Sequence, residues 1–209
     1  MKVVVSGSIG LGKKSLCQSL SKHITNSHLI EEKFDFGDLL SKFYHQQQTS
    51  EKLSSHNKYA MPLQLAYLKS RFDNEMESLK LKNRVVIQER CLFEDRLIFA
   101  EALRKTESMN KVEFEEYLTK YDKKISLVQP PSVLILLRTA LIAQESLIKV
   151  KGNNLETLIS SNYLKALDNE YHSYIKNMRA LCPKTKMVVL DPGSLSKDEL
   201  FKAALKEIV

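Results

Sequence analysis

The sequence contains no tryptophan and only three cysteines, six glycines and five prolines among its 209 residues. Collagen-like and low-complexity chains are dominated by glycine and proline, so both classes are excluded. The cysteines form no C-x-x-C pair and the five histidines show no metal-ligand spacing, which excludes a disulfide framework and a structural zinc site. Free cysteines are typical of reducing compartments, and we therefore predict a cytoplasmic protein. The cysteines are Cys17, Cys91 and Cys182.

Long apolar runs are also missing, because no uninterrupted apolar stretch reaches the roughly 18 residues of a membrane span. The first residues lack the apolar segment and cleavage site of a signal peptide, so we expect neither membrane insertion nor secretion. The net charge is +7, but no run of five like charges occurs, and we expect no nucleic-acid partner. Phosphorylated small molecules remain compatible with this charge. The length fits a single domain over residues 1–209.

A glycine-rich turn with the pattern G-x-x-x-x-G-K follows the first apolar run of the chain. In a P-loop of this kind, backbone N–H groups and a helix N-terminus surround a phosphate, and the lysine reaches the β and γ phosphates. The position after the lysine normally carries a Ser or Thr that ligates Mg²⁺, but here it is Lys14, followed by Ser15. Three readings stay open: Mg²⁺ is held through water and other carboxylates, Lys14 itself neutralises phosphate charge, or nucleotide binding is weak. The motif residues are Gly7, Ser8, Ile9, Gly10, Leu11, Gly12 and Lys13.

Short apolar segments alternate with helical periodicity along the whole chain. This alternation after a P-loop predicts an α/β fold of the P-loop NTPase type, in which a five-stranded parallel sheet lies between two layers of helices. Residues 45–57 are polar and are predicted as a surface insertion, either a loop or a loose helical extension. The predicted strands are Lys2–Val5, His28–Ile30, Arg84–Gln88, Ser132–Leu137 and Met187–Leu190. The predicted helices after the first are Gly37–Tyr44, Tyr59–Leu81, Leu92–Lys105, Lys111–Leu127, Ala140–Lys149, Ser161–Leu181 and Ser196–Ile208.

Charged side chains follow the second and third predicted strands. Glu31 and Glu32 come after the second strand, and Glu89 and Arg90 come after the third. Ligands of parallel α/β sheets bind at the carboxyl ends of the strands, so these side chains are candidate functional residues. One carboxylate of the Glu31-Glu32 pair could act as a base toward a hydroxyl nucleophile.

Three motifs in this order resemble the deoxynucleoside kinases, the group of deoxycytidine, deoxyguanosine and deoxyadenosine kinases, over nearly the entire chain. The first is the Gly-Ser-Ile-Gly-x-Gly-Lys loop. The second is Tyr59-Ala60-Met61-Pro62-Leu63-Gln64 with Arg71 seven residues later. The third is Glu89-Arg90-Cys91 followed by Asp95 and Ile98-Phe99.

The resemblance implies transfer of the γ-phosphoryl group of ATP or another NTP to the 5′-hydroxyl of a deoxynucleoside, with Mg²⁺ as cofactor. Glu32 would be the base, Arg90 would lie near the transferred phosphoryl group, and Glu89 would help to hold Mg²⁺. The P-loop, including Lys13, Lys14 and Ser15, would bind the donor. The remaining substrate contacts implied are Tyr44 and Glu156 at the sugar 3′-hydroxyl, and Gln64, Arg71 and Asp95 at the base edge, which fit adenine, guanine or cytosine.

The lid-like segment 147–156 departs from the family, which carries several arginines there. Leu147 and Asn153 occupy arginine positions, and Lys151 keeps a charge for the donor phosphates but loses the bidentate guanidinium. Two alternatives therefore stand beside the kinase of nucleotide salvage: a catalytically weak or inactive nucleoside-binding or regulatory partner subunit, and a nucleoside monophosphate kinase. The resemblance also implies a homodimer, or a heterodimer with a paralogue. The apolar stripes of 92–103 and 163–178 fit either a dimer face or a core face.

Overall fold

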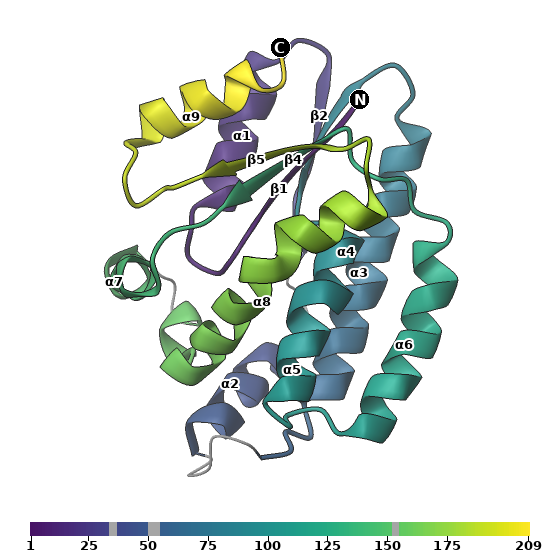
Figure 1. Cartoon of the computed structure of the whole chain (residues 1–209), viewed down its shortest axis with the longest axis vertical. Helices are drawn as coiled ribbons and strands as arrows, with labels where there is room; N and C mark the ends of the chain where they lie inside the picture. Colours follow the sequence, from purple (N-terminus) through teal and green to yellow (C-terminus); the bar gives the residue numbers. More distant parts are fainter. Residues whose placement is uncertain (34–36, 50–54, 152–154) are drawn as a thin grey trace.

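A computed structural model describes residues 1–33, 37–49, 55–151 and 155–209 of the chain, and Figure 1 shows their arrangement. All five strands predicted from the apolar runs are present, each within two residues of its expected bounds. They are β1 (Lys2–Gly7), β2 (Ser27–Ile30), β3 (Val85–Glu89), β4 (Val133–Leu137) and β5 (Lys186–Leu190).

The strands form one parallel sheet in the order β2-β3-β1-β4-β5. The central strand β1 pairs with β3 on one side, Val5 opposite Glu89, and with β4 on the other, Gly7 opposite Leu137. Val3, Val4 and Val5 are fully buried, as expected for a strand covered on both faces. The sheet order brings the carboxyl ends of β1, β2 and β3 to neighbouring positions at one edge of the sheet.

Helices cover both faces of the sheet, as the alternating pattern predicts (Figure 1). Helices α1 and α9 lie over one face, where Leu16, Leu20, Leu200 and Ala204 pack on the strands. The larger core lies on the other face, under the long helices α3 and α8. The helices are α1 (Lys13–His23), α2 (Leu39–Thr49), α3 (Ala60–Lys80), α4 (Leu92–Glu94), α5 (Glu101–Lys105), α6 (Lys111–Ile125), α7 (Leu141–Lys151), α8 (Ser161–Leu181) and α9 (Lys197–Lys206).

One local feature agrees with an alternative left open by the sequence, and a second differs from the prediction. Helix α2 continues past Tyr44 to Thr49, so the first part of the polar insertion is a helical extension; its residues 50–54 lie outside the described part of the chain. The single helix predicted over 92–105 is interrupted by a π-helical stretch, η1 (Asp95–Ala100). Hydrophobic periodicity does not reveal such a change in helical winding, which is often found at functional sites. In the described segments, no helix has the length and apolar character to cross a membrane.

The apolar stripe of α8 belongs to the core of its own chain. Tyr174 and Met178 are fully buried in the larger core, and Leu92 and Leu103 from the other stripe are buried with them. These stripes therefore give the dimer prediction no support. The outward side of α8 is polar, with exposed side chains such as Lys165.

Gly7, at the end of β1, is required by both its backbone and its surroundings. Its φ is +137°, and a Cβ there would collide with the carbonyl oxygen of Leu137 on the adjacent strand. Gly12 also has a positive φ, +77°, but a Cβ there would meet nothing within 4 Å among the described residues. A side chain at Gly12 would therefore meet only an unfavourable φ, whereas a side chain at Gly7 would meet both an unfavourable φ and a clash.

We expect Gly7→Ala to lower the free energy of unfolding by about 2–4 kcal/mol, because the strained φ and the clash act together. Gly12→Ala should lower it by only about 1 kcal/mol, the cost of a left-handed alanine. Urea denaturation of both variants measures the difference. Equal losses for the two variants would show that the β1–β4 contact is not close enough to matter.

Candidate active site

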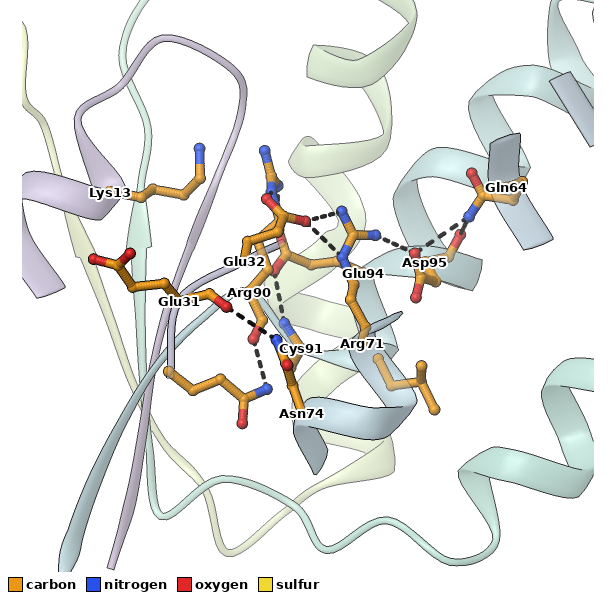
Figure 2. Close-up of polar contacts among 12 residues, drawn as sticks. Lys13, Glu31, Glu32, Gln64, Arg71, Asn74, Arg90, Cys91, Glu94 and Asp95 are labelled. Atoms are coloured by element: carbon orange, nitrogen blue, oxygen red, sulfur yellow. Dashed lines mark hydrogen bonds and ion pairs between the residues drawn. The ribbon is translucent and has the colours of Figure 1, made fainter. Parts of the chain in front are cut away.

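The carboxyl ends of β1, β2 and β3 bring the charged residues predicted from sequence into one buried cluster (Figure 2). Glu32 follows β2, Arg90 follows β3, and Arg71 reaches the same point from the middle of α3. All three are at least 94% buried. Arg71 is held there by α3, whose Gln64, Arg71 and Glu75 side chains are all buried.

Glu32 is the centre of this cluster. Its Oε1 accepts a hydrogen bond from Arg71 Nε (2.8 Å) and another from Arg71 Nη2, while its Oε2 accepts from Arg90 Nε (3.1 Å). Burial alone would raise the pKa of Glu32, but the two guanidinium charges outweigh burial and lower it. The carboxylate is therefore ionised at neutral pH and fixed in orientation by both of its oxygens.

Arg90 has a strained backbone that directs its side chain into the site. Its φ is +60°, uncommon for a residue other than glycine, and its carbonyl accepts a hydrogen bond from Gln88 Nε2 (2.8 Å). Its guanidinium Nη1 donates to the carbonyl of Gly7 (2.9 Å), to Glu94 Oε1 (3.0 Å) and to the Tyr171 hydroxyl (3.0 Å). The guanidinium thus joins the phosphate loop, β3 and α8 at one point.

Asp95 and Gln64 lie on the far side of Arg71 from Glu32 (Figure 2). Arg71 Nη1 bonds Asp95 Oδ1, and Gln64 Nε2 donates to the carbonyl of Asp95 (3.2 Å) and to its Oδ1 (3.3 Å). Burial, opposed by Arg71, raises the pKa of Asp95 to about 7. The other carboxylate oxygen, Asp95 Oδ2, is buried and has no hydrogen-bond partner in the described structure. It is available to a ligand that donates a hydrogen bond.

Several residues of the cluster were not predicted from sequence. Phe99 lies between the two arginines, with the Arg71 and Arg90 guanidinium carbons 4.9 and 4.8 Å from its ring centroid. Tyr171, from distant α8, donates to Glu94 Oε1 (2.7 Å). Phe99 belongs to the third sequence motif, and Glu94 stands only four residues after Arg90, but neither contact was predicted. Nothing in the sequence pairs Tyr171 with residues 77 or more positions away.

Tyr44 and Glu156, predicted at the sugar, lie near each other. Tyr44 is buried, and burial raises the pKa of its hydroxyl, with smaller contributions that include the charge of Glu156. The resemblance places Glu156 in a helix; it begins a short 3₁₀ turn, η2 (Glu156–Leu158), before α8. The pair lies on the α2 side of the larger core, where Phe43 packs edge-on against Tyr163.

The phosphate loop has the expected strand-loop-helix context between β1 and α1. Lys13 Nζ donates to the carbonyl of Ser8 (2.6 Å), and burial together with Arg90 lowers the pKa of Lys13 to about 8. Lys14 is more than half exposed and forms an ion pair with Glu31 Oε2 (3.1 Å). The other oxygen of Glu31, Oε1, accepts a hydrogen bond from Gln18 Nε2 (2.7 Å). Lys14 is therefore paired with Glu31, the carboxylate for which no bond to either arginine is found among the described residues.

Glu89, predicted to help hold Mg²⁺, ends β3 close to Lys13. Its Oε2 is buried without a hydrogen-bond partner in the described structure, and burial raises its pKa. A buried carboxylate oxygen with a free lone pair suits a hard cation. No set of three or more His, Cys, Asp or Glu side chains with metal-binding geometry occurs among the described residues. The fit of Mg²⁺ thus rests on Glu89, together with the donor phosphates that normally complete such a site.

A cavity of about 590 Å³ opens beside the phosphate loop, between α1 and the segment that joins β5 to α9. Its wall includes Gly10, Gly12 and Ser15 of the loop, and Leu147 of α7. The opposite wall, from Pro192 to Lys202, was not predicted from sequence. Of the lid residues, the side chain of Lys151 and the whole of Asn153 lie outside the described part of the chain. The Leu11 side chain is buried in the smaller core beneath the loop, so only its backbone could contact a phosphate.

Known proteins with similar sequences include kinases of deoxynucleosides. The chain is 27% identical over 208 residues to a deoxyadenosine/deoxycytidine kinase of Bacillus subtilis, covering 99% of this chain and 90% of that protein. It is 25% identical over 198 residues to a deoxyadenosine kinase of Dictyostelium discoideum, covering 93% and 76%.

Solved structures give the same fold. Deoxyadenosine kinase from M. mycoides with bound dATP matches 100% of this chain and 99% of its own, with a TM-score of 0.81 at 19% identity. The same enzyme with bound dCTP matches with a TM-score of 0.79 at 19% identity, covering 100% and 98%. The family model of the deoxynucleoside kinases matches residues 3–208, almost the whole sequence. The chain therefore belongs to the deoxynucleoside kinase family.

Proposed function

We propose that this kinase transfers the γ-phosphoryl group of ATP or another NTP to the 5′-hydroxyl of a deoxynucleoside, with Glu32 as the base. The supporting observation is the Glu32 carboxylate, buried and ionised between Arg71 and Arg90 at the edge of the sheet that also carries the phosphate loop. This function would place the protein in nucleotide salvage. The family match favours it over an inactive partner subunit and over a nucleoside monophosphate kinase.

In the proposed step, the 5′-oxygen attacks the γ-phosphorus as the bond from that phosphorus to the β–γ bridging oxygen breaks. The hydroxyl proton passes to a Glu32 oxygen, and the nucleoside diphosphate leaves with the electron pair of the broken bond. The lowered pKa makes Glu32 a weak base, which suffices because phosphoryl transfer proceeds through a loose transition state. Positioning the hydroxyl and offsetting charge, with Arg90 near the transferred group, supply most of the rate.

The donor would bind with its phosphates on the loop backbone and Lys13, and its base in the cavity between the loop and the β5–α9 segment. Lys13 would exchange the Ser8 carbonyl for the β and γ phosphates. When bound, Mg²⁺ supplies positive charge that offsets these phosphates. Glu89 would be its protein ligand, whereas Lys14 stays beside Glu31, outside the phosphate site.

The base edge would lie against Asp95 and Gln64. The unpartnered Asp95 Oδ2 accepts a hydrogen bond from an exocyclic amino group, and Arg71 or Gln64 can donate to the neighbouring ring nitrogen. Adenine and cytosine share this amino-group and ring-nitrogen pair. We therefore propose deoxyadenosine and deoxycytidine as the first substrates to test, in line with the names of the relatives. Tyr44 and Glu156 would contact the sugar 3′-hydroxyl.

The homodimer, the heterodimer with a paralogue and the cytoplasmic location stay predictions. Sedimentation of the purified chain, alone and with a paralogue, would measure the first two.

Replacing Glu32 with Gln should reduce kcat by about 10²- to 10⁴-fold, because the amide cannot accept the 5′-hydroxyl proton. The assay measures phosphoryl transfer with Mg²⁺, using each of the four natural deoxynucleosides and both ATP and GTP as donors. Glu31→Gln is the matched control: it removes the neighbouring carboxylate, which contacts Lys14 and Gln18 but neither arginine.

Glu31→Gln should retain kcat within about threefold, since only an exposed ion pair is lost. Equal rates for the Glu32 and Glu31 variants would contradict the assigned base. Absence of turnover in the unaltered chain with every pair of substrates, together with calorimetric binding of a deoxynucleoside, would instead favour the partner-subunit alternative.

The KM for deoxyadenosine should rise about tenfold as the pH falls from about 8 to about 6, at saturating donor. The pKa of Asp95 is raised to about 7, so the carboxylate takes up a proton in this range and its charge-assisted hydrogen bond to the amino group is lost. The lowered pKa of Glu32 keeps that base ionised, so kcat should change less than KM. Asp95→Asn cannot titrate and should show a flat KM; a rise of the same size in this variant would assign the effect to another group.

Lys14→Ser should lower the Mg²⁺ concentration for half-maximal rate by about three- to tenfold, because a hydroxyl then stands where P-loop kinases ligate the metal. Glu31→Gln is again the control, since it breaks the same ion pair without adding a hydroxyl. The rate is followed during Mg²⁺ titration at fixed ATP. An identical shift in both variants would mean that release of the ion pair, and not a new ligand, changes the metal dependence.

A further inference from the structure

Helix α7 contacts the phosphate loop directly through Gln144. This side chain is 98% buried, and its Nε2 donates to the Ser8 hydroxyl (2.8 Å) and to the carbonyl of Ile9 (2.9 Å). One amide group therefore uses both of its N–H donors on two consecutive residues of the loop. Nothing in the sequence pattern marked Gln144, which lies between the β4 strand and the lid-like segment.

The loop needs such a donor because of how it binds phosphate. Its backbone N–H groups must point toward the ligand, which leaves carbonyl oxygens directed into the protein, where they require partners. The Ser8 carbonyl receives the hydrogen bond of Lys13 Nζ, and the Ile9 carbonyl receives that of Gln144. When Lys13 turns to the donor phosphates, Gln144 remains as the side chain that holds this part of the loop.

The next turn of α7 makes a second contact with the loop. Ile148, four residues after Gln144, lies so close to Gly10 that a Cβ there would come within 2.5 Å of its Cγ1. Leu147, between them, forms part of the wall of the donor cavity. The same helix therefore supports the loop from Ser8 to Gly10 and borders the space proposed for the donor base.

We propose that Gln144 is a positioning residue for the donor, and that α7 sets the geometry of the phosphate loop through it. The inference rests on the proposed function in taking this loop as the donor site. Gln144 lies beside the phosphate loop, and in the described structure it forms no hydrogen bond with Glu32, Arg71 or Asp95. Loss of the Gln144 amide should therefore weaken binding of the donor nucleotide and leave binding of the deoxynucleoside unchanged.

The test compares Gln144→Met, which keeps the length of the side chain but removes both donors, with Ser146→Ala on the exposed side of the same helix. Ser146 donates to the carbonyl of Ile142 within α7. Gln144→Met should raise the KM for MgATP, and its calorimetric Kd, about tenfold, because the Ile9 carbonyl is left buried without a donor. The KM for the deoxynucleoside should stay within about twofold, and Ser146→Ala should change neither constant.

An unchanged donor KM and Kd in Gln144→Met would overturn the proposal, as would equal changes in both substrate constants or a lower Tm alone. If that variant does not fold, Gln144→Asn, which keeps the amide but shortens its reach, should give the same donor-selective loss. Calorimetry with MgATP needs no turnover, so the proposal is tested even if phosphoryl transfer is absent. Absent turnover with normal binding would count against the proposed function alone.

Discussion

The ion pairs of Glu32 with Arg71 and Arg90 are the constraint on which the buried charged cluster of this structure depends. Two guanidinium groups buried together repel each other, and each would be costly without a counter-charge. Glu32 lies between them and gives one oxygen to each. Asp95 then balances Arg71 and Glu94 balances Arg90, so positive and negative groups alternate across the cluster. Removing any one member leaves an uncompensated charge in the core.

This alternation explains why the cluster draws on so many elements. Arg71 comes from α3, Glu32 follows β2, and Arg90 follows β3. Tyr171 on α8 donates a hydrogen bond to Glu94. Buried ion pairs contribute little net stability, because desolvation consumes most of the attraction. The strained φ of Arg90 adds a further cost. Such costs are typical of functional sites, and here they accompany an ionised carboxylate that is held at a defined position.

The fold could be predicted from the sequence because its signals are local. The valines of β1, the G-x-x-x-x-G-K turn and the helical stripes each occupy a few consecutive residues, and all five strands were found from them. Residues at strand ends, such as Glu32 and Arg90, could also be predicted, because parallel strands share one functional edge. Tyr171 and Gln144 could not, since their partners lie far along the chain and only packing brings them together. Phe99 was noted as part of a motif, but its position between Arg71 and Arg90 depends on packing that the motif does not show. The π-helical stretch at Asp95 was missed because hydrophobic periodicity does not distinguish it from an α-helix.

The phosphate loop is held in a different way from the charged cluster. Ion pairs fix the residues of the cluster, whereas the loop carbonyls accept hydrogen bonds from Arg90, Lys13 and Gln144, and Gly10 packs closely on Ile148. Its lysine is already deprotonated in part near neutral pH, because burial and Arg90 lower the pKa of Lys13 to about 8. A bound phosphate would reverse this shift by placing negative charge beside the ammonium. Under the proposed function, donor binding and Lys13 protonation would therefore be coupled, and a bound donor would increase the positive charge of the loop.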